Sequence, residues 1–191
     1  MYIMPMVAIH TVRCHDGRMS ENTAPAASDD APSRAVTASR EINAPAVRIF
    51  ELIADPSQQP RWDGNDNLRE AAEGQRVHAV GDVFAMTLTK GKVRENHVVT
   101  FEEGREIAWM PASEREQPAG HRWGWRLTRL ADDVTMVEHT YDWSQLMDES
   151  RLERARSTTP EMLMASIDRL AKLAESGAGH LDPDGGTGTV A

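Results

Sequence analysis

The 191-residue chain carries 30 acidic and 21 basic side chains, and its formal net charge of -9 argues against a nucleic-acid backbone or an anionic membrane as the main partner. Its single cysteine, Cys14, excludes an internal disulfide, and a reducing cytoplasm is the predicted location. No apolar run approaches the ~20 residues that span a bilayer, so we expect no membrane insertion.

Composition divides the chain into three parts. Residues 1–34 lack periodicity and predict a disordered tail, and the glycine-rich residues 176–191 predict a flexible one. Residues 35–175 carry all five tryptophans and clear periodic segments, which predict one folded domain. Residues 1–18 differ in character from the polar stretch that begins at Met19. We therefore expect residues 1–18 to contribute nothing to the fold, and Met19 is a candidate start of translation.

The domain is predicted to begin with a strand and one or two short helices. Ala35 to Ile42 alternates as a strand does. Ala44-Pro45 then opens a helix, because proline at the first helical position loses no hydrogen bond. Asp55-Pro56 ends this helix, and Pro56 to Trp62 is interpreted as a second short helix or a turn.

From Leu68 onward the chain is typical of successive strands joined by short hairpin links. The expected strands are residues 68–73, 83–90, 93–102, 106–110, 121–130 and 134–143. The longer link Pro111 to Gly120 contains two prolines and a charge cluster, and we expect a loop there.

The segment Pro160 to Ala174 has the signals of a long amphipathic helix. Two starts fit the sequence: a capping box from Thr158 to Glu161, or a Thr159 cap with Pro160 first. Gly177 can end the helix in a left-handed cap.

One face of this helix is apolar, and it is predicted to pack on the sheet. Met162 and Leu173 would widen that face, whereas the preceding charged block, residues 148–156, is interpreted as a solvated helical turn. The stripe itself consists of Leu163, Ile167, Leu170 and Ala174.

Several predicted strands carry large apolar or aromatic side chains on one face. A face with imidazole, phenol and indole groups can surround an apolar molecule and hydrogen-bond its polar end. The same pattern also suits an ordinary packed core, and both interpretations stay open. The residues on this face are Phe84, Met86, Leu88, Ile107, Trp109, Trp123, Trp125, Leu127, Val137, His139, Tyr141 and Trp143.

Two segments carry a family resemblance. INAPAVRIFELIADPSQQPRW resembles the N-terminal signature of the START-like polyketide cyclase/dehydrase and lipid-transport superfamily. VEHTYDWSQLMDESRLERARSTTPEMLMASIDRLAKLAE resembles the C-terminal half of a bacterial branch of it, and the resemblance covers about residues 35–175. It implies an α+β helix-grip fold, in which a curved antiparallel sheet of about seven strands wraps around a long C-terminal helix.

The resemblance also implies a ligand site between the sheet and that helix. A small hydrophobic ligand would be the partner, and no cofactor is implied. The positions that match are Trp62, Phe84, Met86, Leu88, Trp109, Trp123, Trp125, Leu127, His139, Tyr141, Trp143, Leu163 and Ile167. Trp62 could form the mouth of the cavity or close the bottom of the core.

Three polar side chains are candidates for orienting a ligand or transferring a proton: His97, His139 and Tyr141. As alternatives, His97 would lie on the solvent face and Tyr141 would satisfy a backbone carbonyl. The sequence lacks a phosphate-binding loop, an HExxH motif and paired CxxC motifs, so we expect no metal site.

We therefore predict that the protein binds or carries a small hydrophobic or amphipathic molecule, such as a lipid, polyketide or aromatic metabolite. One alternative is a polyketide aromatase/cyclase or dehydratase. Another is a protein-interaction module of co-chaperone type, which would have a filled interior and an exposed apolar patch. Fold alone does not decide among these roles, and it predicts no oligomeric state.

Overall fold

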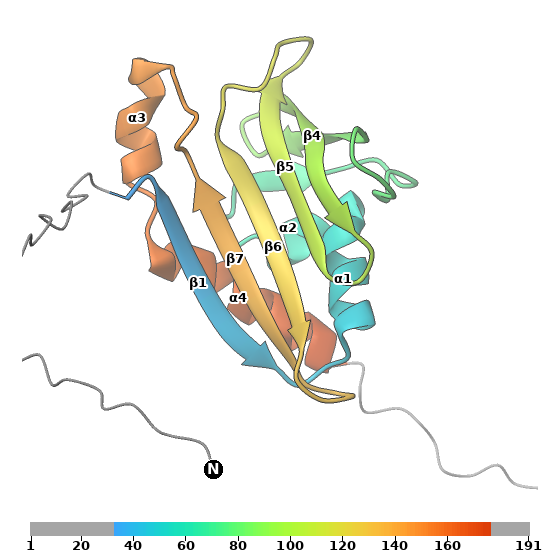
Figure 1. Cartoon of the computed structure of the whole chain (residues 1–191). Helices are drawn as coiled ribbons and strands as arrows, with labels where there is room; N and C mark the ends of the chain where they lie inside the picture. The colour runs from blue at the N-terminus through green and yellow to red at the C-terminus, as the bar shows by residue number, and fades with distance from the viewer. Residues whose placement is uncertain (1–32, 177–191) are drawn as a thin grey trace, which may run out of the picture. The chain divides into compact units, whose positions relative to one another are not determined.

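Seven strands form one antiparallel sheet in the order β1-β7-β6-β5-β4-β3-β2 in the computed structural model, which describes residues 33–176 (Figure 1). The α+β helix-grip fold is thereby confirmed. The predictions for the two tails, Met19 and Gly177 concern residues outside the described ones. The elements are β1 (Ala35–Ile42), α1 (Ala46–Ala54), the 3-10 helix η1 (Pro56–Gln58), α2 (Gln59–Trp62), β2 (Leu68–Glu70), β3 (Val83–Leu88), β4 (Val93–Glu102), β5 (Glu106–Ser113), β6 (Arg122–Arg129), β7 (Thr135–Asp142), α3 (Glu149–Arg156) and α4 (Pro160–Glu175).

The helices α1, α2 and α4 lie behind the sheet in Figure 1, and α3 lies beside the upper ends of β1 and β7. We call the face toward α4 the inner face and the opposite one the outer face. The upper end of the sheet in Figure 1 holds the start of β6 and the end of β7. No helix within residues 33–176 has the length and apolar character needed to cross a membrane.

Strand bounds differ from the predicted ones at β2 and β5. β2 ends at Glu70 instead of residue 73. β5 continues through Pro111 to Ser113, where we had expected a loop. Beyond Trp109 this strand pairs only with β4, and proline is tolerated where a strand has a free edge.

Helix α4 packs through its predicted stripe, whose four residues are all 0% exposed. Thr159 is the N-cap and Pro160 the first helical residue, so the capping box from Thr158 is not formed. Leu173 packs against the core as expected. Met162 is 40% exposed, contrary to prediction, because it points about 100° around the helix from Leu163.

Helix α3 is less solvated than predicted. Asp148 caps it by accepting a hydrogen bond from the Ser150 backbone N–H. Its side chains Leu152 and Ala155 pack against the core, so the helix is attached to the domain by an apolar contact.

Hydrogen bonds connect the corner Trp62-Asp63-Gly64 to α1, to the residues that follow it and to α4. The Trp62 indole N–H donates to the Leu52 carbonyl, and the Asp63 carboxylate accepts backbone N–H groups from three residues of the loop that follows. The Gly64 N–H donates to the Ser166 hydroxyl at 2.9 Å. These contacts favour the structural interpretation of Trp62 over a place at the cavity mouth.

This corner yields a test of how α4 is held. A Cβ atom on Gly64 would lie 2.5 Å from the Ser166 backbone nitrogen, whereas one on Gly124 of β6 would meet only Ala108 Cβ at 3.7 Å. We expect Gly64→Ala to lower the free energy of unfolding by ~1–3 kcal/mol through overpacking. Gly124→Ala should raise it by about 0.5–1 kcal/mol, because glycine weakens a strand.

Urea denaturation of both variants, each against the parent protein, measures these changes. Equal stability of the Gly64→Ala variant and the parent would show that the corner does not press on α4.

Candidate functional site

A row of aromatic rings runs along the inner faces of β6 and β7. The strand register places Trp123 opposite Tyr141 and Trp125 opposite His139. The Trp125 and His139 rings stack with centroids 3.8 Å apart and planes 9° apart. The Trp123 and Tyr141 centroids are 4.2 Å apart. We call Trp123, Trp125, His139, Tyr141 and Trp143 the aromatic row.

His139 is held in one tautomer within this row. Its Nδ1 lies 2.9 Å from the Gly124 carbonyl oxygen, and a carbonyl can only accept a hydrogen bond. Nδ1 therefore carries the proton, and Nε2 is left as an acceptor. No hydrogen-bond partner for Nε2 exists among the described residues.

Burial lowers the pKa of His139 from 6.5 to about 4, although the bond to the Gly124 carbonyl acts in the opposite direction. The imidazole is thus neutral at pH 7. A neutral ring stacked on two indoles keeps a lone pair on Nε2 without the cost of a buried charge.

Trp125 adds an unpaired donor next to this acceptor. The residue is 1% exposed, and its Nε1 is buried without a hydrogen-bond partner. Trp62 packs edge-on against the same indole, with centroids 5.2 Å apart, so the ring cannot turn toward solvent. The buried part of the aromatic row therefore offers one hydrogen-bond donor and one acceptor in an apolar wall.

The upper end of the aromatic row is less enclosed. Trp123 is half-buried, as is His121, whose ring lies 6.0 Å from that of Tyr141. Burial raises the pKa of Tyr141, so its phenol stays protonated. The neighbouring ring of Trp143 lies 5.4 Å from Tyr141.

The other predicted site residues belong to the packed core or its edge. Phe84 and Trp109 meet edge-on with centroids 5.5 Å apart, and Leu88 is half-buried. The remaining four, all at most 3% exposed, are Met86, Leu127, Leu163 and Ile167.

His97 lies on the outer face, because its neighbour Asn96 points inward beside Phe84. Its Nε2 is buried and unpaired, but it is separated from His139 by the sheet. The three polar candidates therefore cannot act on one ligand together. His139 and Tyr141 are consecutive inner-face positions of β7, so these two side chains could contact one ligand together.

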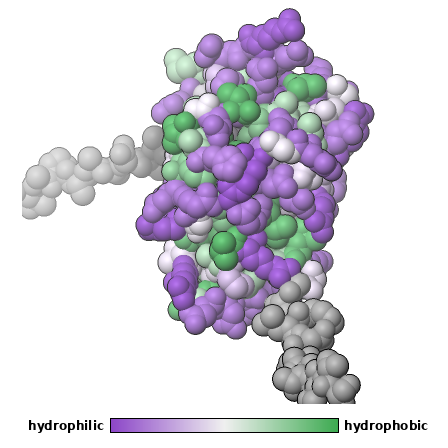
Figure 2. Space-filling model, turned by 90° about the vertical axis from the view of Figure 1, so that its right-hand side faces the viewer, coloured by the Kyte–Doolittle hydropathy of each residue, from purple (hydrophilic) through white to green (hydrophobic). Residues whose placement is uncertain are grey.

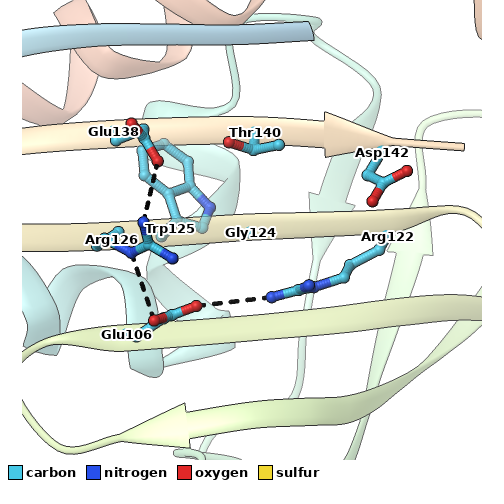
Figure 3. A pocket seen from close by; sticks show the side chains of 8 residues that line it. All are labelled: Glu106, Arg122, Gly124, Trp125, Arg126, Glu138, Thr140 and Asp142. Carbon is cyan, nitrogen blue, oxygen red and sulfur yellow. Dashed lines mark hydrogen bonds and ion pairs between the residues drawn. The ribbon is translucent and has the colours of Figure 1, made fainter. Parts of the chain in front are cut away.

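Figure 3 shows a hollow on the outer face, centred on Gly124, with a volume of about 110 Å³. Gly124 and Ala108 leave it open because neither has a long side chain. Glu106 bridges Arg122 and Arg126 at 3.6 and 3.4 Å, and Arg126 reaches Glu138 at 3.8 Å. A second hollow is lined by residues between Gly74 and Phe84. Neither hollow lies between the sheet and α4.

Sequence reasoning did not foresee the charge cluster formed by Glu106, Arg122, Arg126 and Glu138. The signal was the glycine between Trp123 and Trp125, which leaves a gap in an otherwise bulky strand. Within residues 33–176, no three His, Cys, Asp or Glu side chains are grouped so that they could hold a metal ion.

A family model described as polyketide cyclase / dehydrase and lipid transport matches residues 33–175. The chain belongs to this family. The matched residues include all seven strands and all the helices of the described domain. The family resemblance is therefore not limited to the two segments quoted above. Membership supports a domain that binds a small molecule, and it leaves the molecule open.

The chain is similar to a curated protein in sequence and to two solved structures in fold. Over 117 residues the chain is 32% identical to the uncharacterized protein Rv0088 of Mycobacterium tuberculosis, covering 60% of this chain and 50% of that protein. The chain thus spans about half the length of the curated relatives it matches. Protein MLL2253 from Mesorhizobium loti aligns with a TM-score of 0.56 at 18% identity, over 75% of this chain and 98% of that one.

DynU16, a protein in the dynemicin biosynthetic locus, aligns with a TM-score of 0.54 at 18% identity, over 76% of this chain and 49% of that one. At such identities the two solved structures show a common fold and nothing about ligands.

The low pKa values of His121 and His139 predict how the free energy of unfolding depends on pH. The pKa values of His121 and His139 are both lowered from 6.5 to about 4, so the unfolded chain binds these protons first as the pH falls. The contribution of the two neutral histidines to stability is complete above pH 6.5 and is lost as the pH falls from 6.5 to about 4. Each histidine contributes a slope of at most about 1.4 kcal/mol per pH unit.

Urea denaturation at several pH values from 7 to 5 tests this dependence. His139→Gln keeps a donor for the Gly124 carbonyl but cannot be protonated, so the slope should fall by about half. An unchanged slope in the variant would contradict the low pKa of His139.

Proposed function

We propose that the domain binds a small amphipathic molecule, such as a lipid, polyketide or aromatic metabolite, between the aromatic row and α4. The observation that carries this proposal is Trp125 Nε1, which is buried without a hydrogen-bond partner and belongs to a ring stacked on His139, whose Nε2 accepts no hydrogen bond within residues 33–176. In a core built only for stability, such atoms would be paired or absent.

The unpaired donor has a free-energy consequence. A buried N–H without a partner costs ~1–3 kcal/mol relative to one that is hydrogen-bonded. A ligand hydroxyl can donate to His139 Nε2, and a ligand oxygen can accept from Trp125 Nε1. Binding would therefore remove a cost that the free protein bears.

The upper end of the sheet is the favoured entrance. Val36 of β1, opposite Tyr141, and Trp123 of β6 are half-buried there, whereas Ala38 and Trp125 further down are buried. A ligand entering at this end would pass from half-buried to fully buried side chains along one strand face.

The same geometry makes a proton-transfer enzyme the less favoured role. A general acid or base works best when its pKa lies near the operating pH, and the pKa of His139 is about 4. Its imidazole is therefore a weak base at neutral pH. We retain the polyketide cyclase or dehydratase as an alternative and favour binding.

An interaction module would have a filled interior, and neither hollow described above lies between the sheet and α4. We favour it less because it also requires a large exposed apolar patch. Figure 2 shows small hydrophobic areas separated by hydrophilic residues on the face it displays. The large exposed apolar side chains come from separate elements, among them Val47 of α1 and Met162 of α4. Separately, we keep the prediction that the protein is located in the cytoplasm.

Neighbouring positions of β1 provide a matched test of the site. Val36 faces the aromatic row and Thr37 faces outward. We expect Val36→Trp to fill the entrance and weaken binding of the neutral probe N-phenyl-1-naphthylamine at least about tenfold. Thr37→Trp should leave the affinity unchanged. Titration followed by probe fluorescence measures both, with circular dichroism confirming that each variant is folded.

Absence of saturable binding by the parent protein would overturn the proposed function. Equal weakening by both tryptophan variants would place the site elsewhere.

A further inference from the structure

Three arginines from two elements gather at the entrance. Arg94 lies at the start of β4 on the inner face, because its register partners are Met86 and Ser113. Arg151 and Arg154 lie three positions apart on α3, and thus on one side of that helix. We call Arg94, Arg151 and Arg154 the entrance arginines.

All three entrance arginines lie near one half-buried ring. The pKa of His121 is lowered to about 4, first by burial and then by the charges of Arg151, Arg94 and Arg154. Arg154 also acts on the phenol of Tyr141. The fold places the three arginines at the same end of the sheet as these rings: Arg94 pairs with Ser113 at the end of β5, and α3 lies beside the upper ends of β1 and β7 (Figure 1). At this end His121, Tyr141 and Trp123 contact one another.

Packing holds this arrangement in place. Leu152 and Ala155 anchor α3 to the core. Gly120 has φ +101 and lies so close to the Gln145 carbonyl that a Cβ atom would collide with it. The segment carrying His121 is therefore packed against the link from β7 to α3, the helix that carries Arg151 and Arg154.

The positive charge at this end is only partly balanced. Arg151 pairs with Asp148 at 3.0 Å. For Arg94 and Arg154, no carboxylate within residues 33–176 comes within 4.0 Å of the guanidinium group. Arg94 makes one side-chain hydrogen bond, to the Ser113 hydroxyl at 3.3 Å. His121 is neutral at pH 7, so it neither adds to this charge nor opposes it.

We propose that the ligand is an amphipathic anion, whose carboxylate or phosphate binds the entrance arginines while its apolar body lies along the aromatic row. This inference rests on the proposed function and names the charge of its ligand. Guanidinium groups bind both kinds of anion through charge-assisted hydrogen bonds. The half-buried site strengthens such bonds relative to bulk water.

Four ligands with one ten-carbon chain test the charge: decanoate, decyl phosphate, decanol and decyltrimethylammonium. Isothermal titration calorimetry of the whole chain at low salt should show the two anions binding about tenfold or more tightly than decanol. The cation should bind more weakly than decanol. Raising the salt concentration should reduce the advantage of the anions, because the site is partly exposed.

Arginine variants locate the effect. We expect Arg94→Gln and Arg154→Gln each to weaken decanoate binding by about 5–20-fold and to leave decanol binding unchanged. Arg129→Gln is the matched control, since Arg129 is 67% exposed at the opposite end of β6. It should alter neither affinity.

The outcomes separate the two proposals. Decanoate and decanol binding with equal affinity, unaffected by the arginine variants, would overturn the anionic ligand and leave the binding function intact. Failure of all four ligands, together with the neutral naphthylamine probe, would overturn both. A preference between decanoate and decyl phosphate identifies the head group as carboxylate or phosphate.

Discussion

The pairing of β1 with β7 is the interaction on which the rest of the domain depends. Eight consecutive residue pairs join the first strand to the last, from Ala35 with Asp142 to Ile42 with Thr135. This pairing brings together segments about a hundred residues apart, and α4 packs across both strands. Without it, the stripe on α4 would have no continuous apolar surface to cover, and the upper end of the sheet would lack one wall.

Much of the fold could be predicted because it follows from local periodicity. A period of two assigned His139, Tyr141 and Trp143 to the inner face, and a helical period assigned Leu163 and Ile167 to the buried stripe. The errors arose where an individual residue met a particular neighbour. Pro111 is accommodated because β5 has a free edge there, and α3 is anchored by Leu152, which the charged residues around it obscured in the sequence.

The candidate site could be predicted only in part, for a physical reason. Strand alternation tells which side chains share a face, but the charge at the entrance comes from Arg94 and from α3, which lie more than fifty residues apart. That these elements lie at one end of the sheet follows from the strand register at Arg94 and from the close contact of Gly120 with Gln145, neither of which local periodicity shows. The free nitrogen of His139 likewise depends on which carbonyl its other nitrogen reaches.

That last contact has a consequence for how the protein can change over time. The orientation of the His139 ring is fixed by a main-chain oxygen, which every residue type supplies, and not by another side chain. Mutations elsewhere, including one at Gly124, can therefore leave the carbonyl in place and Nε2 unprotonated. A lineage could vary the side chains around residue 139 while inheriting the same acceptor atom, which a substitution at residue 139 itself would remove.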